Sequence, residues 1–180
     1  FINSPDIKNI VLASMGPVYF DGTTFRGKDP ARVQGQVVTL LGKKELNNSW
    51  KIYELAMRDT FARLSSLDDR GVVFVIDVPE LGIDHGCYTG GKELDVGRWR
   101  LSDLVGGIAA NQCKIPRSEY DQRTLEYRRL VFEIASEFPS VRVFDPINLF
   151  CDEAWCYGFL PEVGYLYRDA DHLSKSGSLY

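Results

Sequence analysis

Long apolar runs, metal-binding cysteine spacings and an excess of basic residues are all missing from this sequence. Its strongest apolar segments, residues 10–13 and 72–76, are far shorter than the ~20 residues that a membrane-spanning helix needs. A net charge of −4 argues against general nucleic-acid binding, which requires a basic face to neutralise phosphates. There is no C-x-x-C pair, and the two histidines, His85 and His172, are far apart, so no metal site is predicted.

The composition fits one folded domain. At 180 residues, with 44% hydrophobic and 26% charged positions, the chain can bury a substantial core, and residues 1–180 are predicted to form a single soluble domain. The chain begins at Phe1 with neither a methionine nor a signal peptide, so we interpret it as a fragment of a longer protein, truncated at its N-terminus.

The four cysteines, Cys87, Cys113, Cys151 and Cys156, fall into two sequence-local groups. Four cysteines allow three connectivities, and the local one, Cys87 with Cys113 and Cys151 with Cys156, is favoured. Metal binding and unpaired structural thiols are the alternatives. If the disulfides form, the protein belongs to an oxidising compartment, which is the periplasm or the outside of the cell.

Strand and helix patterns alternate along the chain. They predict strands at residues 10–13, 72–78 and 141–144, with a loop at Gly16 after the first of them. They also predict two helices. One runs from Ser49 to the break at residues 68–71, and the other opens with a Ser118–Asp121 capping box. Residues 80–116 are expected to form a long irregular segment. This order favours an α/β sandwich with a parallel sheet, in which sites gather beyond the carboxyl ends of the strands.

The sequence Asp169-Ala170-Asp171-His172 places a carboxylate three residues before a histidine. In a turn or a first helical turn, this spacing lets Asp169 bind the imidazole N–H and fix its tautomer, which prepares the ring to act as general base for a hydroxyl nucleophile. Asp171 is the competing partner, but the residue next to the histidine is expected to point elsewhere. Ser174 is expected to cap a helix that follows. The alternative is a surface Asp–His pair without a catalytic role.

Three further groups are candidates for substrate contacts. His85 lies in the loop after the strand at residues 72–78, where a solvated loop histidine is the alternative. The sequence Arg98-Trp99-Arg100 offers an aromatic face flanked by cations, suited to stacking on a sugar and holding an anion, and the alternative is a loop anchored by a buried tryptophan. Trp155, between two cysteines, either walls the pocket beside His172 or covers the disulfide.

Several of these segments carry a family resemblance. They are residues 72–82, the loop from Cys87 to Cys113, the helix at residues 117–129, residues 150–156, and the ending Leu166-Tyr167-Arg168-Asp169-Ala170-Asp171-His172-Leu173-Ser174. In this order they resemble the SGNH (GDSL-type) hydrolase fold, and more narrowly the extracytoplasmic SGNH domain fused to acyltransferase-3 family membrane O-acyltransferases. The resemblance implies a three-layer, flavodoxin-like sandwich whose first strands lie upstream of Phe1. It also implies His172 as general base, Asp169 as its orienter, and neither a metal nor an organic cofactor.

The nucleophile of that family is the serine of a Gly-Asp-Ser block after the first strand. This chain has neither G-D-S nor G-x-S-x-G, so the nucleophile is expected upstream of Phe1. The later block, where many members carry G-x-N-D, here reads Ala13-Ser14-Met15-Gly16-Pro17 and lacks the asparagine. Ser14 is a candidate substitute nucleophile, and the Gly16 backbone N–H is a candidate oxyanion donor, with a plain turn glycine as the alternative.

The resemblance implies an O-acyltransferase that passes an acetyl or similar group through a seryl ester to a carbohydrate hydroxyl. Its partners would be a surface glycan, such as lipopolysaccharide, and an acyl donor delivered by a fused or partner membrane domain. That membrane portion would tether the domain to the periplasmic side of the inner membrane. A carbohydrate esterase of the same fold and a non-catalytic glycan-binding module are the alternatives, and the fragment alone is expected to be inactive.

Overall fold

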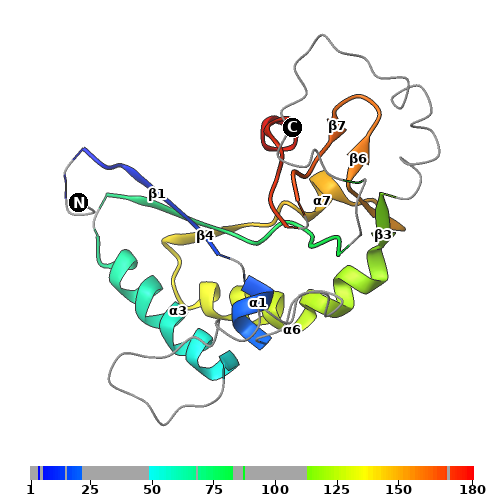
Figure 1. The fold of residues 1–180 in the computed structure, drawn as a ribbon. Coiled ribbons are helices and arrows are strands. Elements are labelled where there is room, and N and C mark those ends of the chain that lie inside the picture. The colour runs from blue at the N-terminus through cyan, green and yellow to red at the C-terminus, as the bar shows by residue number, and fades with distance from the viewer. Residues whose placement is uncertain are drawn as a thin grey trace. The chain divides into compact units, whose positions relative to one another are not determined.

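The computed structural model describes residues 4, 6–14, 16–21, 49–67, 69–82, 87, 113–169 and 171–180 of the protein. The chain divides into two compact units, Phe1–Asp77 with Arg123–Pro146, and Val78–Gln122 with Ile147–Tyr180. The first unit contains the parallel sheet (Figure 1). The second contains both disulfides and the D-x-x-H segment.

The first unit is built on a three-stranded parallel sheet in the order β1-β2-β4. Its strands are β1 (Asn9–Ala13), β2 (Gly71–Val75) and β4 (Val141–Phe144). Ile10 lies opposite Val72, which in turn lies opposite Val141. Branched aliphatic side chains of this kind fit a pleated, half-buried surface. The parallel sheet expected from the sequence is therefore confirmed.

Two long helices pack against one face of this sheet (Figure 1). They are α3 (Ser49–Ser65) and α6 (Arg117–Ser136), of which the residues from Arg123 onward belong to the first unit. Their buried side chains join those of the strands in one core, made of Tyr53, Met57, Phe61, Leu64, Val72, Phe74, Ile76, Tyr127, Leu130, Val131, Ile134, Ala135 and Val141.

The opposite face of the sheet carries apolar side chains that are open to solvent. Val11 is 67% exposed and Phe144 is 48% exposed. Since the described helices of this unit pack on one face only, the second helical layer of the predicted three-layer sandwich stays a prediction.

Strand β2 is shorter than the predicted span of residues 72–78. It ends at Val75, and the Ile76 N–H donates one last hydrogen bond of 2.9 Å to the Phe144 carbonyl. Its partner β4 has four residues and ends at Phe144.

Two other predictions need correction. Gly16 begins a short helix, α1 (Gly16–Asp21), where a loop was expected; Pro17 in its first turn loses no hydrogen bond there, since first-turn N–H groups lack helical acceptors. The expected Ser118–Asp121 capping box is absent, because α6 already begins at Arg117 and Asp121 binds the Arg117 guanidinium at 3.0 Å.

The second unit consists of short elements. β3 (Lys114–Pro116) pairs antiparallel with β5 (Trp155–Tyr157), and β6 (Phe159–Leu160) pairs antiparallel with β7 (Gly164–Tyr165). The helices α7 (Ile147–Phe150) and α8 (Lys175–Leu179) also belong to it, as does the first part of α6. Strands of two or three residues are too short for an alternating pattern to predict them.

Both favoured disulfides are present. Cys87 is bonded to Cys113, with 5.2 Å between their Cα atoms, and Cys151 is bonded to Cys156, with 3.9 Å between theirs. All four cysteines are therefore used in local cross-links. Among the helices that the structure describes, none has the length and apolar character needed to cross a bilayer.

Candidate active site

The D-x-x-H segment forms the tip of a hairpin in the second unit. Tyr167 and Leu173 face each other in an antiparallel bridge at its base, and the Arg168 N–H donates to the His172 carbonyl at 3.0 Å. The chain therefore reverses direction between Arg168 and His172. The helix expected after Ser174 starts at Lys175, three residues after the histidine. The D-x-x-H motif therefore lies in a turn outside the helix.

Ser174 fastens the C-terminal side of this hairpin. Its N–H donates to the Leu166 carbonyl at 2.9 Å, and its hydroxyl donates to the Tyr165 carbonyl at 2.6 Å. The same hydroxyl oxygen accepts from the Gly177 N–H at 2.9 Å and caps α8, as the sequence predicts. These bonds fix the backbone that leads out of His172 to strand β7.

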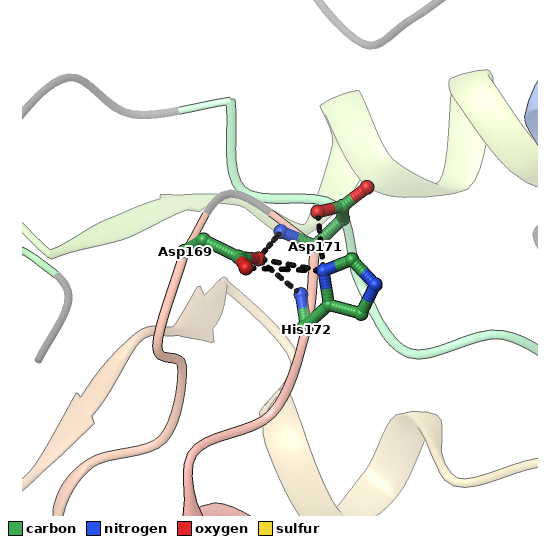
Figure 2. Close-up of side chains that lie close together, drawn as sticks. All are labelled: Asp169, Asp171 and His172. Carbon is green, nitrogen blue, oxygen red and sulfur yellow. Dashed lines mark hydrogen bonds and ion pairs between the residues drawn. The ribbon is translucent and has the colours of Figure 1, made fainter. Parts of the chain in front are cut away.

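The Asp169 carboxylate holds both the backbone and the ring of His172. Oδ1 accepts from the N–H groups of Asp171, at 3.2 Å, and His172, at 2.8 Å, which is the usual way in which an aspartate stabilises a turn. Nδ1 of the imidazole lies 2.9 Å from Oδ1 and 3.1 Å from Oδ2 of the same carboxylate (Figure 2).

This contact assigns the roles of the two ring nitrogens. An ionised carboxylate only accepts hydrogen bonds, so Nδ1 of His172 carries the proton and Nε2 offers its lone pair. Nε2 points away from both carboxylates in Figure 2. The His172 side chain is 48% exposed, which leaves the ring open to an incoming hydroxyl group.

The pKa of Asp169 is lowered from 3.8 to about 2. Partial burial alone would raise this pKa, but the hydrogen bonds donated by the backbone N–H groups of His172 and Asp171, with side-chain contacts to the same residues, outweigh it. The carboxylate therefore stays ionised at neutral pH, as an orienter of an imidazole must.

Asp171 also contacts the ring, contrary to the expectation that it points elsewhere. Its Oδ1 lies 3.1 Å from Nδ1 of His172. The Asp171 side chain is only 12% exposed, against 41% for Asp169. The tight turn around the Asp169 carboxylate brings residue 171 back over the ring, a geometry that the linear spacing does not reveal.

The sequence of this chain matches a known protein family. The family model described as SGNH domain (fused to AT3 domains) matches residues 1–180. The chain belongs to the SGNH family. No curated protein and no solved structure matches it. Membership places this SGNH domain among esterase-type and acyltransferase-type enzymes, and it is consistent with an extracytoplasmic location.

Ser14 and Gly16 of the SGNH domain lie in the first unit, at the carboxyl end of β1. The Ser14 hydroxyl lies 3.1 Å from the Tyr53 hydroxyl. Burial raises the pKa of Tyr53 above its ordinary 10.0, although hydrogen bonds to Ser14 and Tyr127 oppose the rise. Ser14 is thus paired with a protonated phenol, a contact between residues 39 positions apart that no local sequence signal predicts.

The Gly16 N–H already has an acceptor, because it donates to the Ser14 carbonyl at 2.7 Å. An oxyanion would have to displace that carbonyl. The backbone at Gly16 also lies close to a side chain, since a Cβ atom there would lie 2.0 Å from Cζ of Tyr127. The glycine is needed for packing whatever role its N–H has.

Trp155 lies on β5 beside the Cys151–Cys156 disulfide. The Lys114 ammonium lies 4.1 Å from the centroid of the Trp155 ring. The backbone N–H of Trp155 donates to Oδ1 of Asp152 at 2.7 Å. The Trp155 carbonyl also accepts from the Asp152 N–H at 2.9 Å. None of these three contacts involves His172. The remaining candidates, His85, Arg98, Trp99 and Arg100, lie outside the described residues.

Asp169, Asp171 and His172 are also the group that could offer ligands to a cation. Within the described residues they supply three ligand atoms that all lie within 4.8 Å of one another. Exposed carboxylates often gather in this way without binding metal, and Nδ1 serves here as a hydrogen-bond donor. The arrangement fits an oriented general base better than a metal site.

Proposed function

We propose that this SGNH domain transfers an acetyl or similar acyl group to a carbohydrate hydroxyl through a seryl ester, with His172 as general base and Asp169 as its orienter. The observation that carries the proposal is the 2.9 Å contact between Nδ1 of His172 and Oδ1 of Asp169, with Nε2 on the outer side of the ring (Figure 2). Because the 180 residues contain no Gly-Asp-Ser sequence, we assign the nucleophile to a serine outside them.

The chemistry has two symmetrical halves. In the first, Nε2 of His172 removes the serine proton as the hydroxyl oxygen attacks the acyl carbonyl, and the imidazolium then gives that proton to the departing donor group. In the second, Nε2 removes the proton of a sugar hydroxyl, which attacks the seryl ester, and the proton returns to the serine. The ionised Asp169 stabilises the imidazolium in both halves.

Transfer to water is the second candidate, and the 48% exposure of the His172 side chain favours it, because water can reach the ring directly. The proposed partners and place follow from the family description and from the two disulfides, which suit an oxidising compartment. We propose a periplasmic domain, tethered to the inner membrane, that receives its acyl donor from a membrane domain and modifies a surface glycan.

The test uses the protein with its membrane portion and compares acetylated glycan with released acetate. His172→Gln and Asp169→Asn should each lower turnover, by up to roughly 10⁴-fold, the scale seen when such a base or its orienter is lost. Asp59→Asn is the matched control, since Asp59 is an exposed carboxylate paired with Arg63 on α3. Normal turnover in His172→Gln would refute the assignment, and acetate as sole product would make the enzyme an esterase.

A third outcome separates enzyme from binding module. Glycan binding without either product, in the full-length protein, would identify a non-catalytic module that keeps the fold. That result would also overturn the assignment of His172 as a base.

A further inference from the structure

We propose that Asp171 is a second positioning carboxylate for His172, and that its negative charge stabilises the imidazolium while Asp169 orients the ring. The inference rests on the proposed function of His172 and extends it to a residue that the D-x-x-H spacing leaves unassigned. It arises from the structure alone, since the sequence predicted that the side chain of Asp171 points away.

The first support is the convergence of two carboxylates on one ring nitrogen. Oδ1 of Asp171 lies 3.1 Å from Nδ1 of His172, and Oδ1 of Asp169 lies 2.9 Å from the same atom (Figure 2). Both carboxylates are therefore on the Nδ1 side, and neither stands between Nε2 and a substrate.

The second support is a division of roles between the two carboxylates. The hydrogen bonds of Nδ1 go to both oxygens of Asp169, whereas Asp171 approaches at ion-pair distance. A hydrogen bond fixes the direction of the ring, while an ion pair acts through charge and distance. Asp171 is suited to the second task because, at 12% exposure, its charge is less screened by water than that of Asp169 at 41%.

The third support is the difference between the resting and the reacting state. When both are ionised, two carboxylates beside a neutral imidazole repel each other. When Nε2 takes a proton, a positive charge appears between them and that repulsion is offset. Stabilisation that is larger in the charged state than in the resting state lowers the barrier. The Arg168 guanidinium, 3.4 Å from Oδ2 of Asp169, is the cation that moderates the repulsion at rest.

Substitution by asparagine isolates the charge. Asp171→Asn keeps the size of the side chain and the residue-171 N–H that donates to Asp169, so the turn is retained. Asp169→Asn and the double variant complete a cycle that separates the two carboxylates. Asp59→Asn removes one negative charge on α3, where Asp59 pairs with Arg63, and serves as the control for net charge.

The direct measurement is the proton titration of the His172 ring by NMR. The chain has two histidines, so the signal is assigned by its loss in His172→Gln. The titration midpoint should move to lower pH in Asp171→Asn, because the charged ring loses a neighbouring anion, and further in the double variant. An unchanged midpoint in Asp171→Asn overturns the proposal.

Turnover provides the second measurement. In Asp171→Asn, kcat for acyl transfer should fall roughly tenfold, a fraction of the ~10²–10⁴ that general-base catalysis supplies, while KM is unchanged. A lower titration midpoint with normal kcat would refute the catalytic role of Asp171. Normal turnover in His172→Gln would instead refute the proposed function, so the two failures are distinguishable.

Discussion

Replacing Gly177 by alanine tests the anchoring of the His172 hairpin. A Cβ atom at residue 177 would lie 2.0 Å from the carbonyl oxygen of Leu166 and 2.9 Å from its Cα. These are backbone atoms, which cannot rotate aside as a side-chain tip does. Helix α8 must therefore move away from Leu166, and the hydrogen bonds that Ser174 makes to Leu166 and Tyr165 lengthen or break.

The expected loss in the free energy of unfolding combines two unfavourable contributions and one favourable one. Forcing a methyl group into a packed site costs about 1–3 kcal/mol, and the two weakened hydrogen bonds cost about 1 kcal/mol each. Alanine's better helix propensity returns about 1 kcal/mol. The net loss is about 2–4 kcal/mol, which lowers the melting temperature by about 5–15 °C for a chain of this size.

The assay is thermal and urea unfolding of Gly177→Ala beside Ser176→Ala, in which the neighbouring exposed serine is changed without new contacts. The control should unfold at the wild-type temperature. If Gly177→Ala also melts there, the close approach of α8 to Leu166 is wrong, and with it the reason given for the position of His172.

Two further predictions follow from the same structure. Gly16→Ala should destabilise the first unit by about 1–3 kcal/mol, because its methyl group would meet the buried ring of Tyr127. Adding Tyr127→Leu, with its smaller side chain, should recover part of that loss in urea unfolding. A wild-type unfolding midpoint for Gly16→Ala alone would contradict the contact. Because the folded-state pKa of Asp169 is about 2 rather than 3.8, its ionised carboxylate stabilises the fold fully above pH 3.8 and loses that effect as the pH falls through about 2. The unfolding midpoint of Asp169→Asn should therefore vary less between pH 4 and pH 2 than that of the wild type, and equal slopes would argue against the low pKa.

The sequence predicts the features that depend on local pattern. Apolar runs at residues 10–13 and 72–76 identify two strands of the sheet, because buried parallel strands are nearly continuous in apolar residues. The third is indicated by the strand-forming residues of Val141-Arg142-Val143-Phe144. The Asp169–His172 contact is predictable for a similar reason, since a turn of fixed size brings residues three apart together. The local disulfide pairing belongs to the same class.

Features that depend on distant residues escape such patterns. The Ser14–Tyr53 hydrogen bond joins residues 39 positions apart, and β3 pairs with β5, from which α6, β4 and α7 separate it in the sequence. Asp171 also escapes a local pattern, because its side chain is directed toward His172 by a turn in which the Asp169 carboxylate binds two successive N–H groups. The end of β2 depends on the length of β4, a property of the partner strand.

The general base of this site and its orienting carboxylate are carried by one short loop. In many hydrolases the orienting carboxylate and the histidine come from separate segments, and any shear between those segments spoils their alignment. Here Asp169 and His172 belong to one hairpin tip, which is held by the hydrogen bond from the Arg168 N–H to the His172 carbonyl and by the Tyr167–Leu173 bridge. A shift of this loop would therefore carry the carboxylate and the imidazole together and leave their 2.9 Å contact in place.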